Sequence, residues 1–185
     1  MTHNEMKAKV LALIEEINPD DENLTEDPDI QAKYIDVANQ ILFELARNKK
    51  IPKYVEINVQ KGDIIDFEVI GQALGCEVYQ LSLVSGVNHR AKASGTVIKV
   101  LEGGVLEIEC FVYPERITEE NAASYVFALS ADALEVMPYG IAADLLKSDV
   151  SAEYGAVYAT RYESMLQRLD PRYQTSVVYI EGGIS

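Results

Sequence analysis

Histidine is the side chain that most often does acid–base or metal chemistry near neutral pH, and this chain has two of them. His3 lies near the start of the chain, where we expect a frayed terminus, and His89 lies in a predicted loop. Neither stands beside a nucleophile or at the spacing of metal ligands. The sequence holds no Gly-x-Ser-x-Gly elbow, phosphate-binding glycine loop or His-Glu-x-x-His motif. A catalytic pair could assemble from distant segments, but the pattern favours a protein that is not an enzyme and binds no cofactor.

Carboxylates are abundant, yet they do not form a metal-binding pattern. Residues 19–29 are dense in Asp and Glu, but they lack the alternating ligands, central Gly and distal Glu of a calcium loop. The pairs Glu15–Glu16 and Glu119–Glu120 are adjacent in sequence, so we expect them on exposed turns and not converging on one site. The sequence therefore predicts a solvated interhelical loop at 19–29 and no metal site.

The net charge of −14, from 30 acidic and 16 basic residues, disfavours adhesion to a phosphate backbone. It fits either plain solubility with self-repulsion or a surface that lets nucleic acid pass without sticking, and composition does not separate the two. Cys76 and Cys110 lie in strand-like apolar sequence without CxxC spacing, so we expect small core residues and no disulfide.

The 185 residues suffice for one domain of ordinary size or a domain with a small inserted module. No apolar run approaches the roughly 20 residues of a membrane span, and the start of the chain lacks the pattern of a signal peptide. We therefore expect a soluble protein that stays in the cytoplasm, without a membrane partner.

Residues 1–50 are predicted to form a helical hairpin. Apolar residues recur at helical spacing in Asn4–Ile17, and Asn18 and Pro19 end that pattern. A second periodic stretch runs from Ile30 to Leu45, with Asp27 or Asp29 as its cap and Pro28 in or near its first turn.

Residues 51–117 switch to the alternation that is typical of half-buried strands, which predicts an inserted, mainly antiparallel β-module of five strands. Glu102-Gly103-Gly104 is a tight-turn signal that predicts a hairpin between the last two strands. The stretch Gly86–Gly95 is either a mobile hairpin loop or a basic spot for an acidic partner, formed by His89, Arg90 and Lys92. The expected strands are 54–59, 65–69, 76–84, 96–101 and 105–113.

Residues 118–171 are predicted to form a helical pair. Ser130 is suited to cap a helix over Ala131–Lys147, in which Pro138 implies either a kink or a helix that begins near Pro138. Asp149 or Ser151 is the expected cap of the second helix. A stripe on that helix is expected to pack against other helices, with its hydroxyls at the rim; stacking on nucleic acid is the alternative. The stripe consists of Tyr154, Tyr158, Tyr162 and Met165.

Residues 172–185 contain strand-like sequence with no neighbour in the chain to pair with. We expect a C-terminal arm that joins a sheet of this chain or of another subunit. The fold class is thus α+β: a four-helix framework of two N-terminal and two C-terminal helices, with an inserted β-module and this arm. The candidate docking residues of the arm are Tyr173, Val177, Val178, Tyr179 and Ile180.

Three stretches in succession, Phe111–Thr118, Leu134–Asp149 and Tyr158–Leu169, resemble the head-to-tail adaptor (connector) proteins of tailed phages and prophages. In that family a strand end leads to a Pro-Tyr-x-x-Ala-Ala-x-Leu-Leu helix, which here begins at Pro138. A Ser-Asp turn and a closing helix with Tyr-Glu-x-x-Leu follow, the latter beginning here at Tyr162.

The resemblance implies a helical bundle with an inserted β-module that assembles as an oligomeric ring beneath the portal. Its implied partners are copies of itself, the portal protein and tail or neck proteins, with DNA only as cargo passing through the lumen. It also implies a location in the bacterial cytoplasm during assembly and then in the virion neck or tail, and it brings no catalytic residues.

A non-catalytic ligand-binding β-module for carbohydrate or peptide, carried on a helical scaffold, is the alternative function. It predicts an exposed aromatic cluster formed by Tyr54, Phe67 and Tyr79. The absence of Trp weakens the case for a sugar-stacking site.

Overall fold

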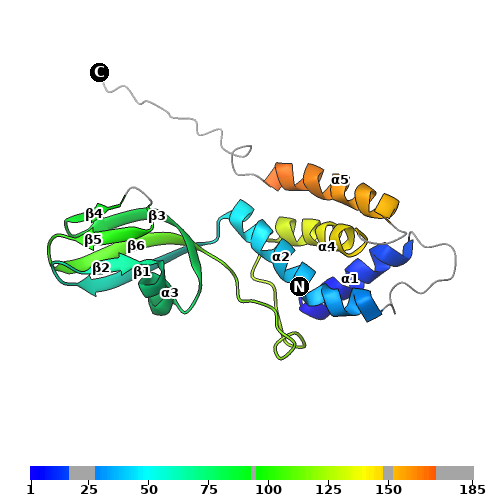
Figure 1. Cartoon of the computed structure of the whole chain (residues 1–185), viewed down its shortest axis with the longest axis horizontal. Helices are drawn as coiled ribbons and strands as arrows, with labels where there is room; N and C mark the ends of the chain where they lie inside the picture. Colours follow the sequence, from blue (N-terminus) through cyan, green and yellow to red (C-terminus); the bar gives the residue numbers. More distant parts are fainter. Residues whose placement is uncertain (17–27, 93–94, 148–151, 170–185) are drawn as a thin grey trace, which may run out of the picture.

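The computed structural model describes residues 1–16, 28–92, 95–147 and 152–169. They form an α+β fold with two lobes, one helical and one built mainly of strands, and each lobe has its own hydrophobic core (Figure 1). The predicted α+β class is confirmed: five helices and two small antiparallel sheets lie in the described part of the chain.

The helical lobe is formed by α1 (His3–Glu16), α2 (Pro28–Lys49), α4 (Ala131–Leu145) and α5 (Ala152–Leu169). The apolar stripes seen in the sequence are the buried faces: Met6, Val10 and Ile14 of α1 are fully buried. Pro28 is the first residue of α2, where its missing N–H costs nothing, as predicted. The cap proposed at Asp27 and the loop at 19–27 lie outside the described residues.

Helix α4 lies at the centre of this lobe and packs against α1, α2 and α5 (Figure 1). Because three helices cover α4, most of its residues are buried, and it has no continuous polar face along its length. It runs through Pro138 without interruption, so a helix that begins near Pro138 is wrong. Ser130 stands at the N-cap position in extended conformation, but its side chain does not cap the helix by a hydrogen bond.

Residues 118–130 form turns and extended chain, so the predicted helical pair begins only at Ala131. The turn that starts at Thr118 is closed by Asn121, whose side chain accepts from the Thr118 N–H and donates to the Arg116 carbonyl. Beyond it, Val126 forms an isolated bridge with Thr2, which anchors the start of α1. Local side-chain hydrogen bonds of this kind compete with helix formation.

The β-module holds six strands in the described residues, one more than predicted. One sheet has the order β1-β6-β3 and the other the order β2-β5-β4, with every pair antiparallel. Both sheets contribute to a single core, which includes Ile98 of β5 and Ile108 of β6. The strands are β1 (Pro52–Val59), β2 (Ile64–Asp66), β3 (Val78–Gly86), β4 (His89–Ala91), β5 (Val97–Val100) and β6 (Gly104–Val112).

The strand predicted at 65–69 is wrong, because only its first two residues belong to β2 and a helix, α3 (Phe67–Leu74), follows at once. Asp66 caps this helix: its carboxylate accepts from the Val69 N–H at 3.0 Å. Gly75 ends it in the left-handed conformation at φ +66°. Both capping signals were present in the sequence, and the short alternation at 65–69 concealed them.

The hairpin predicted at Glu102-Gly103-Gly104 is also wrong, because β5 and β6 belong to different sheets. The turn carries the chain from one layer of the module to the other, and β6 then pairs with β1, starting with Gly104 opposite Val59. Gly104 has φ +150°, a conformation that L residues rarely adopt, so the crossing requires glycine. Turn chemistry indicated a reversal but not the partner of the next strand.

Candidate interaction surfaces

The docking residues predicted in the arm, Tyr173, Val177, Val178, Tyr179 and Ile180, lie outside the described residues. The caps predicted at Asp149 and Ser151 also lie outside them. The candidate surfaces of the described chain belong to the two lobes.

Part of the basic stretch Gly86–Gly95 is a strand, because residues 89–91 form β4 and pair with β5. Arg90 of β4 lies opposite Lys99 of β5, and Lys99 has Ile64 of β2 as its other neighbour. Cross-strand partners share one face of a sheet, so these three exposed side chains form a basic face. His89 is half-buried, and its Nδ1 lies 2.9 Å from the Val87 carbonyl oxygen.

The other sheet carries an acidic face that the sequence analysis missed. Glu56 of β1 lies directly opposite Glu107 of β6, and Tyr54 of β1 lies opposite Glu109 of β6. The Tyr54 hydroxyl donates to Glu56 Oε1 at 3.2 Å. Desolvation and the nearby carboxylates of Glu107 and Glu56 raise the pKa of that hydroxyl. The alternating glutamates of β6 were visible in the sequence, but their neighbour in β1 depended on the register.

Hydroxyl groups of β3 complete this acidic face. Ser85 Oγ donates to Glu107 Oε2 at 2.8 Å, and Ser82 Oγ donates to Glu109 Oε1 at 3.4 Å. Leu83, on the same strand, exposes 58% of its surface. We define the acidic face as Glu56, Glu107 and Glu109 with Tyr54 and Leu83.

The aromatic cluster predicted for ligand binding is not formed. Tyr54 is 57% exposed on β1, whereas Phe67 packs against the core of the β-module at the start of α3. Tyr79 lies between the lobes, where its ring contacts Phe111 and Tyr113. The three side chains serve three different environments, because the strand predicted to present Phe67 is a helix.

Two tyrosines of the α5 stripe pack against the other helices, as predicted. Tyr158 and Tyr162 are buried, whereas Tyr154 is 45% exposed. The Tyr158 hydroxyl donates to the Leu13 carbonyl of α1, and the Tyr162 hydroxyl donates to Glu44 Oε2 of α2 at 2.8 Å. Burial, and then the bond to the Glu44 carboxylate, raise the pKa of Tyr162.

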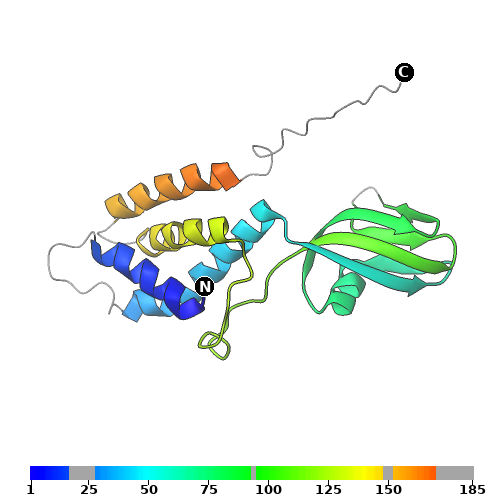
Figure 2. The same ribbon diagram turned by 180° about the vertical axis from the view of Figure 1, so that it is seen from behind.

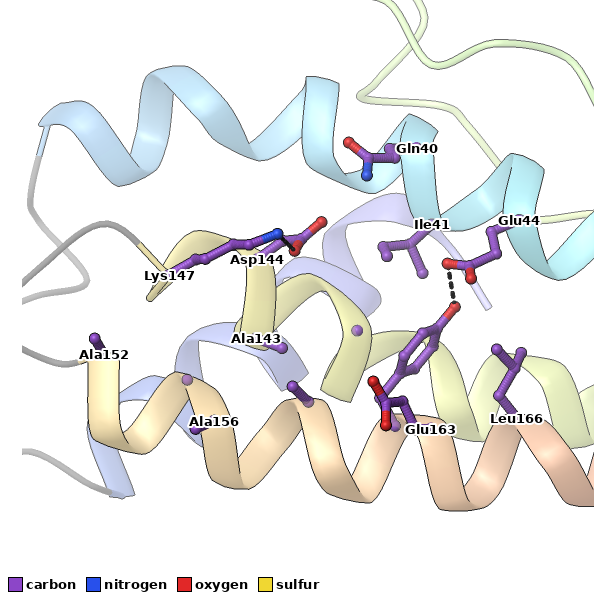
Figure 3. A pocket seen from close by; sticks show the side chains of 14 residues that line it. Gln40, Ile41, Glu44, Ala143, Asp144, Lys147, Ala152, Ala156, Glu163 and Leu166 are labelled. Atoms are coloured by element: carbon purple, nitrogen blue, oxygen red, sulfur yellow. Dashed lines mark hydrogen bonds and ion pairs between the residues drawn. The ribbon is translucent and has the colours of Figure 1, made fainter.

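A groove of about 400 Å³ lies between α2, α4 and α5 around Tyr162 (Figure 3). Small residues of α5, including Ala152 and Ala156, form one wall. Lys147 is paired with Asp144 at 3.5 Å, and Glu44 receives the tyrosine hydroxyl, so these charges already have partners. The groove is therefore best explained by helix packing.

The two lobes meet in a cluster of aromatic and basic side chains centred on Tyr113. Its hydroxyl accepts from Arg47 Nε at 2.6 Å, and its ring lies 5.0 Å from that of Phe43 and 4.7 Å from that of Tyr79. The Tyr79 hydroxyl donates to the Ala46 carbonyl at the end of α2, at 3.1 Å. The cluster thus ties α2 to both β3 and the chain that leaves β6, next to the two segments that join the lobes (Figure 2).

The side chains first considered for chemistry do not converge. His3 is buried against Tyr34 and is not at a frayed end, because its N–H donates to the Tyr125 carbonyl. Cys110 is fully buried as predicted and Cys76 is half-buried, and both are free thiols. Within the described ranges no three His, Cys, Asp or Glu side chains come close enough together to hold a metal ion.

Helices in the described part of the chain lack the combined length and apolar character that a membrane span requires. No protein-family model and no curated protein matches the chain.

Proposed function

We propose that this chain is a non-catalytic head-to-tail adaptor subunit, which joins a phage or prophage portal to the tail as part of an oligomeric ring around a DNA-conducting lumen. Its partners in this proposal are copies of itself, the portal protein and neck or tail proteins. The arm beyond residue 171 is the segment that docks onto the portal, and DNA passes without specific contacts.

The observation that carries the proposal is the placement of the β-module between α2 and α4. The module has its own core and meets the helical lobe at one end (Figure 1), and each of its sheets exposes outward side chains, such as Glu56 on one and Lys99 on the other. This is the arrangement that the resemblance implies, a helical bundle with an inserted β-module. The net charge of −14 supports passage of DNA, because a basic lumen would hold it.

Binding to assembled rings of a phage portal protein provides the test. Full-length chain, a chain ending at residue 172, and a matched control ending at residue 180 are each sedimented with assembled portal rings and imaged by negative stain. We expect the full-length chain and the control to add a ring of density to the portal. We expect the chain ending at 172 to stay in the supernatant while its circular dichroism remains that of a folded protein, because the described residues up to Leu169 form a hydrophobic core in each lobe.

Two outcomes would count against the proposal. Equal binding by all three chains would show that the arm does not dock. Failure of the folded full-length chain to bind the portal would overturn the adaptor function itself.

A further inference from the structure

The β-module carries opposite charges on its two outer faces. Core residues of both sheets, such as Ile98 and Ile108, point into one shared interior. Because successive side chains of a strand point to opposite sides, the residues beside them in sequence point away from that interior. Lys99 follows Ile98, and Glu107 precedes Ile108, so the basic face and the acidic face look outward on opposite sides of the module.

Each face contains a cross-strand pair of like charges. Glu56 lies opposite Glu107 on the acidic face, and Arg90 lies opposite Lys99 on the basic face. Like charges placed directly opposite each other destabilise a sheet by a few tenths of a kcal/mol to about 1 kcal/mol. Among the described residues neither Arg90 nor Lys99 has an acidic side chain within ion-pair distance. The isolated chain therefore bears two unfavourable pairs of opposite sign.

We propose that the β-modules of neighbouring copies associate face to face, the acidic face of one copy on the basic face of the next. A single contact of this kind brings both like-charge pairs together and neutralises them. The inference deepens the proposed function by naming the surfaces through which copies meet, and it rests on that proposal for the expectation that copies meet at all.

Apolar side chains on both faces support a second copy as the occupant. Ile64 exposes 61% of its surface on the basic face, next to Lys99. On the acidic face Tyr54 and Leu83 are more than half exposed. Nucleic acid would use the basic face alone and would leave these apolar groups and the acidic face without a partner. A charged and partly apolar surface on each side is what a protein interface combines.

The two faces differ, so the contact is heterologous. Contacts of this type close into a ring when the rotation between copies allows it and otherwise extend as a filament. Most of the excess negative charge lies outside residues 51–117, which hold nine acidic and six basic residues. Repulsion between whole chains therefore opposes the contact without acting directly at the two faces, and moderate salt relieves it.

Charge reversal on one face at a time gives a specific test with the full chain. The variant Arg90→Glu/Lys99→Glu has two acidic faces, and the variant Glu56→Lys/Glu107→Lys has two basic faces. We expect self-association of each, measured by sedimentation velocity and light scattering, to be at least about tenfold weaker than that of the wild type. An equimolar mixture of the two variants should associate again, because each acidic face then meets a basic face on the other variant.

The control Lys9→Glu/Lys33→Glu changes the net charge by the same amount as the first variant, at exposed positions of the helical lobe. It should associate like the wild type. Carbodiimide coupling should join Glu107 of one copy to Lys99 of another, as located by mass spectrometry, and the yield should fall in both face variants. Circular dichroism confirms that all variants are folded.

Three results would overturn the inference: a wild-type chain that stays monomeric up to about 1 mM, a mixture that fails to recover association, or a control that loses it. The assay contains no portal protein, so its failure leaves portal docking by the arm untouched. Equally, a chain that associates through these faces but does not bind the portal would overturn the adaptor function alone.

Discussion

The helical lobe and the β-module use their polar side chains in different ways. In the helical lobe, polar groups are buried and join elements that are distant in sequence, as Tyr162 does with Glu44 and Asn39 with Ile117. In the β-module, side-chain hydrogen bonds lie on the sheet surface, as between Ser85 and Glu107. These bonds of the first lobe are closed off inside the chain, whereas those of the second lie on a surface that a neighbour can reach. This difference suggests that helices provide the frame and the module provides contacts.

Alkaline pH should give the largest difference in stability between the helical lobe and the β-module. Burial, aided by the charge of Glu115, raises the pKa of Tyr125 to about 12, and burial also raises those of Tyr34 and Tyr162. A phenol whose pKa is higher in the folded state contributes stability that is fully present below its unfolded pKa of about 10. That stability is lost as the pH rises through the folded pKa. We expect the helical lobe to unfold between about pH 10 and pH 12, followed by tyrosinate absorbance and by methyl NMR signals of the two cores.

The β-module has alkaline liabilities of its own: burial raises the pKa of the Cys110 thiol, and desolvation raises the pKa values of the Tyr79 and Tyr54 hydroxyls. The pH titration is therefore repeated with Cys110→Ala, which removes the thiol. In this background the methyl signals of Ile98 should outlast those of Ile141. Loss of both sets at the same pH would mean that the two cores unfold as one unit.

Removal of a buried amide should give the next largest effect. Asn39 is 2% exposed, and its side chain both donates to the Ile117 carbonyl and accepts from the Ile117 N–H, each at 2.8 Å. Asn39→Ala leaves two buried backbone groups without partners, which should lower the free energy of unfolding of the helical lobe by about 3 kcal/mol. Urea unfolding of the wild type and the variant, followed separately for each core, measures this.

The matched control for Asn39→Ala is Gln40→Ala, an exposed neighbour on the same helix. It should change the same free energy by less than about 0.5 kcal/mol. If Asn39→Ala lowered the free energy of unfolding of the β-module as much as that of the helical lobe, the two cores would not unfold independently. A loss near zero in both would mean that water replaces the amide.

The sequence predicted the two lobes well because periodicity reports which face of an element is buried. Met6, Val10 and Ile14 are buried as their spacing indicated, and all pairing in the module is antiparallel. The sequence-based prediction failed at α3, because this helix has only eight residues. Over so short a stretch the helical periodicity cannot be distinguished from the alternation of a strand. It also failed at Gly104, because partner choice depends on tertiary packing.

The candidate faces could not have been predicted for the same reason. Glu107 and Glu109 were evident as polar positions that alternate along one strand, but the register alone places Glu56 opposite Glu107. Likewise Arg90 and Lys99 lie nine positions apart in sequence and become neighbours only through the β4–β5 pairing. The arm was predicted from sequence, and that prediction stands untested.

The smallest effect on stability is expected where the lobes join. Tyr113→Ala removes the ring that contacts Phe43 and Tyr79 and the hydroxyl that accepts from Arg47. Tyr113 and Phe43 are only partly buried and pack at the edge of the helical core, so neither core should lose more than about 1 kcal/mol. The angle between the lobes should instead become less defined, because the segments around residues 51 and 114 would then hold it with few side-chain contacts. Residual dipolar couplings analysed lobe by lobe, with small-angle scattering, measure this directly.

Tyr154→Ala removes an exposed tyrosine of α5 and is the matched control, which should leave the couplings unchanged. A Tyr113→Ala variant whose lobes keep the wild-type alignment would mean that the remaining contacts fix the angle, among them the bond from the Val112 N–H to the Ile51 carbonyl at 3.1 Å and the bond from the Tyr79 hydroxyl to the Ala46 carbonyl. If the angle does loosen while both cores remain intact, the aromatic cluster is what sets the direction in which the module presents its two charged faces. Since a ring closes only at one rotation per copy, the same substitution should then broaden the size distribution of any assembly that the faces form.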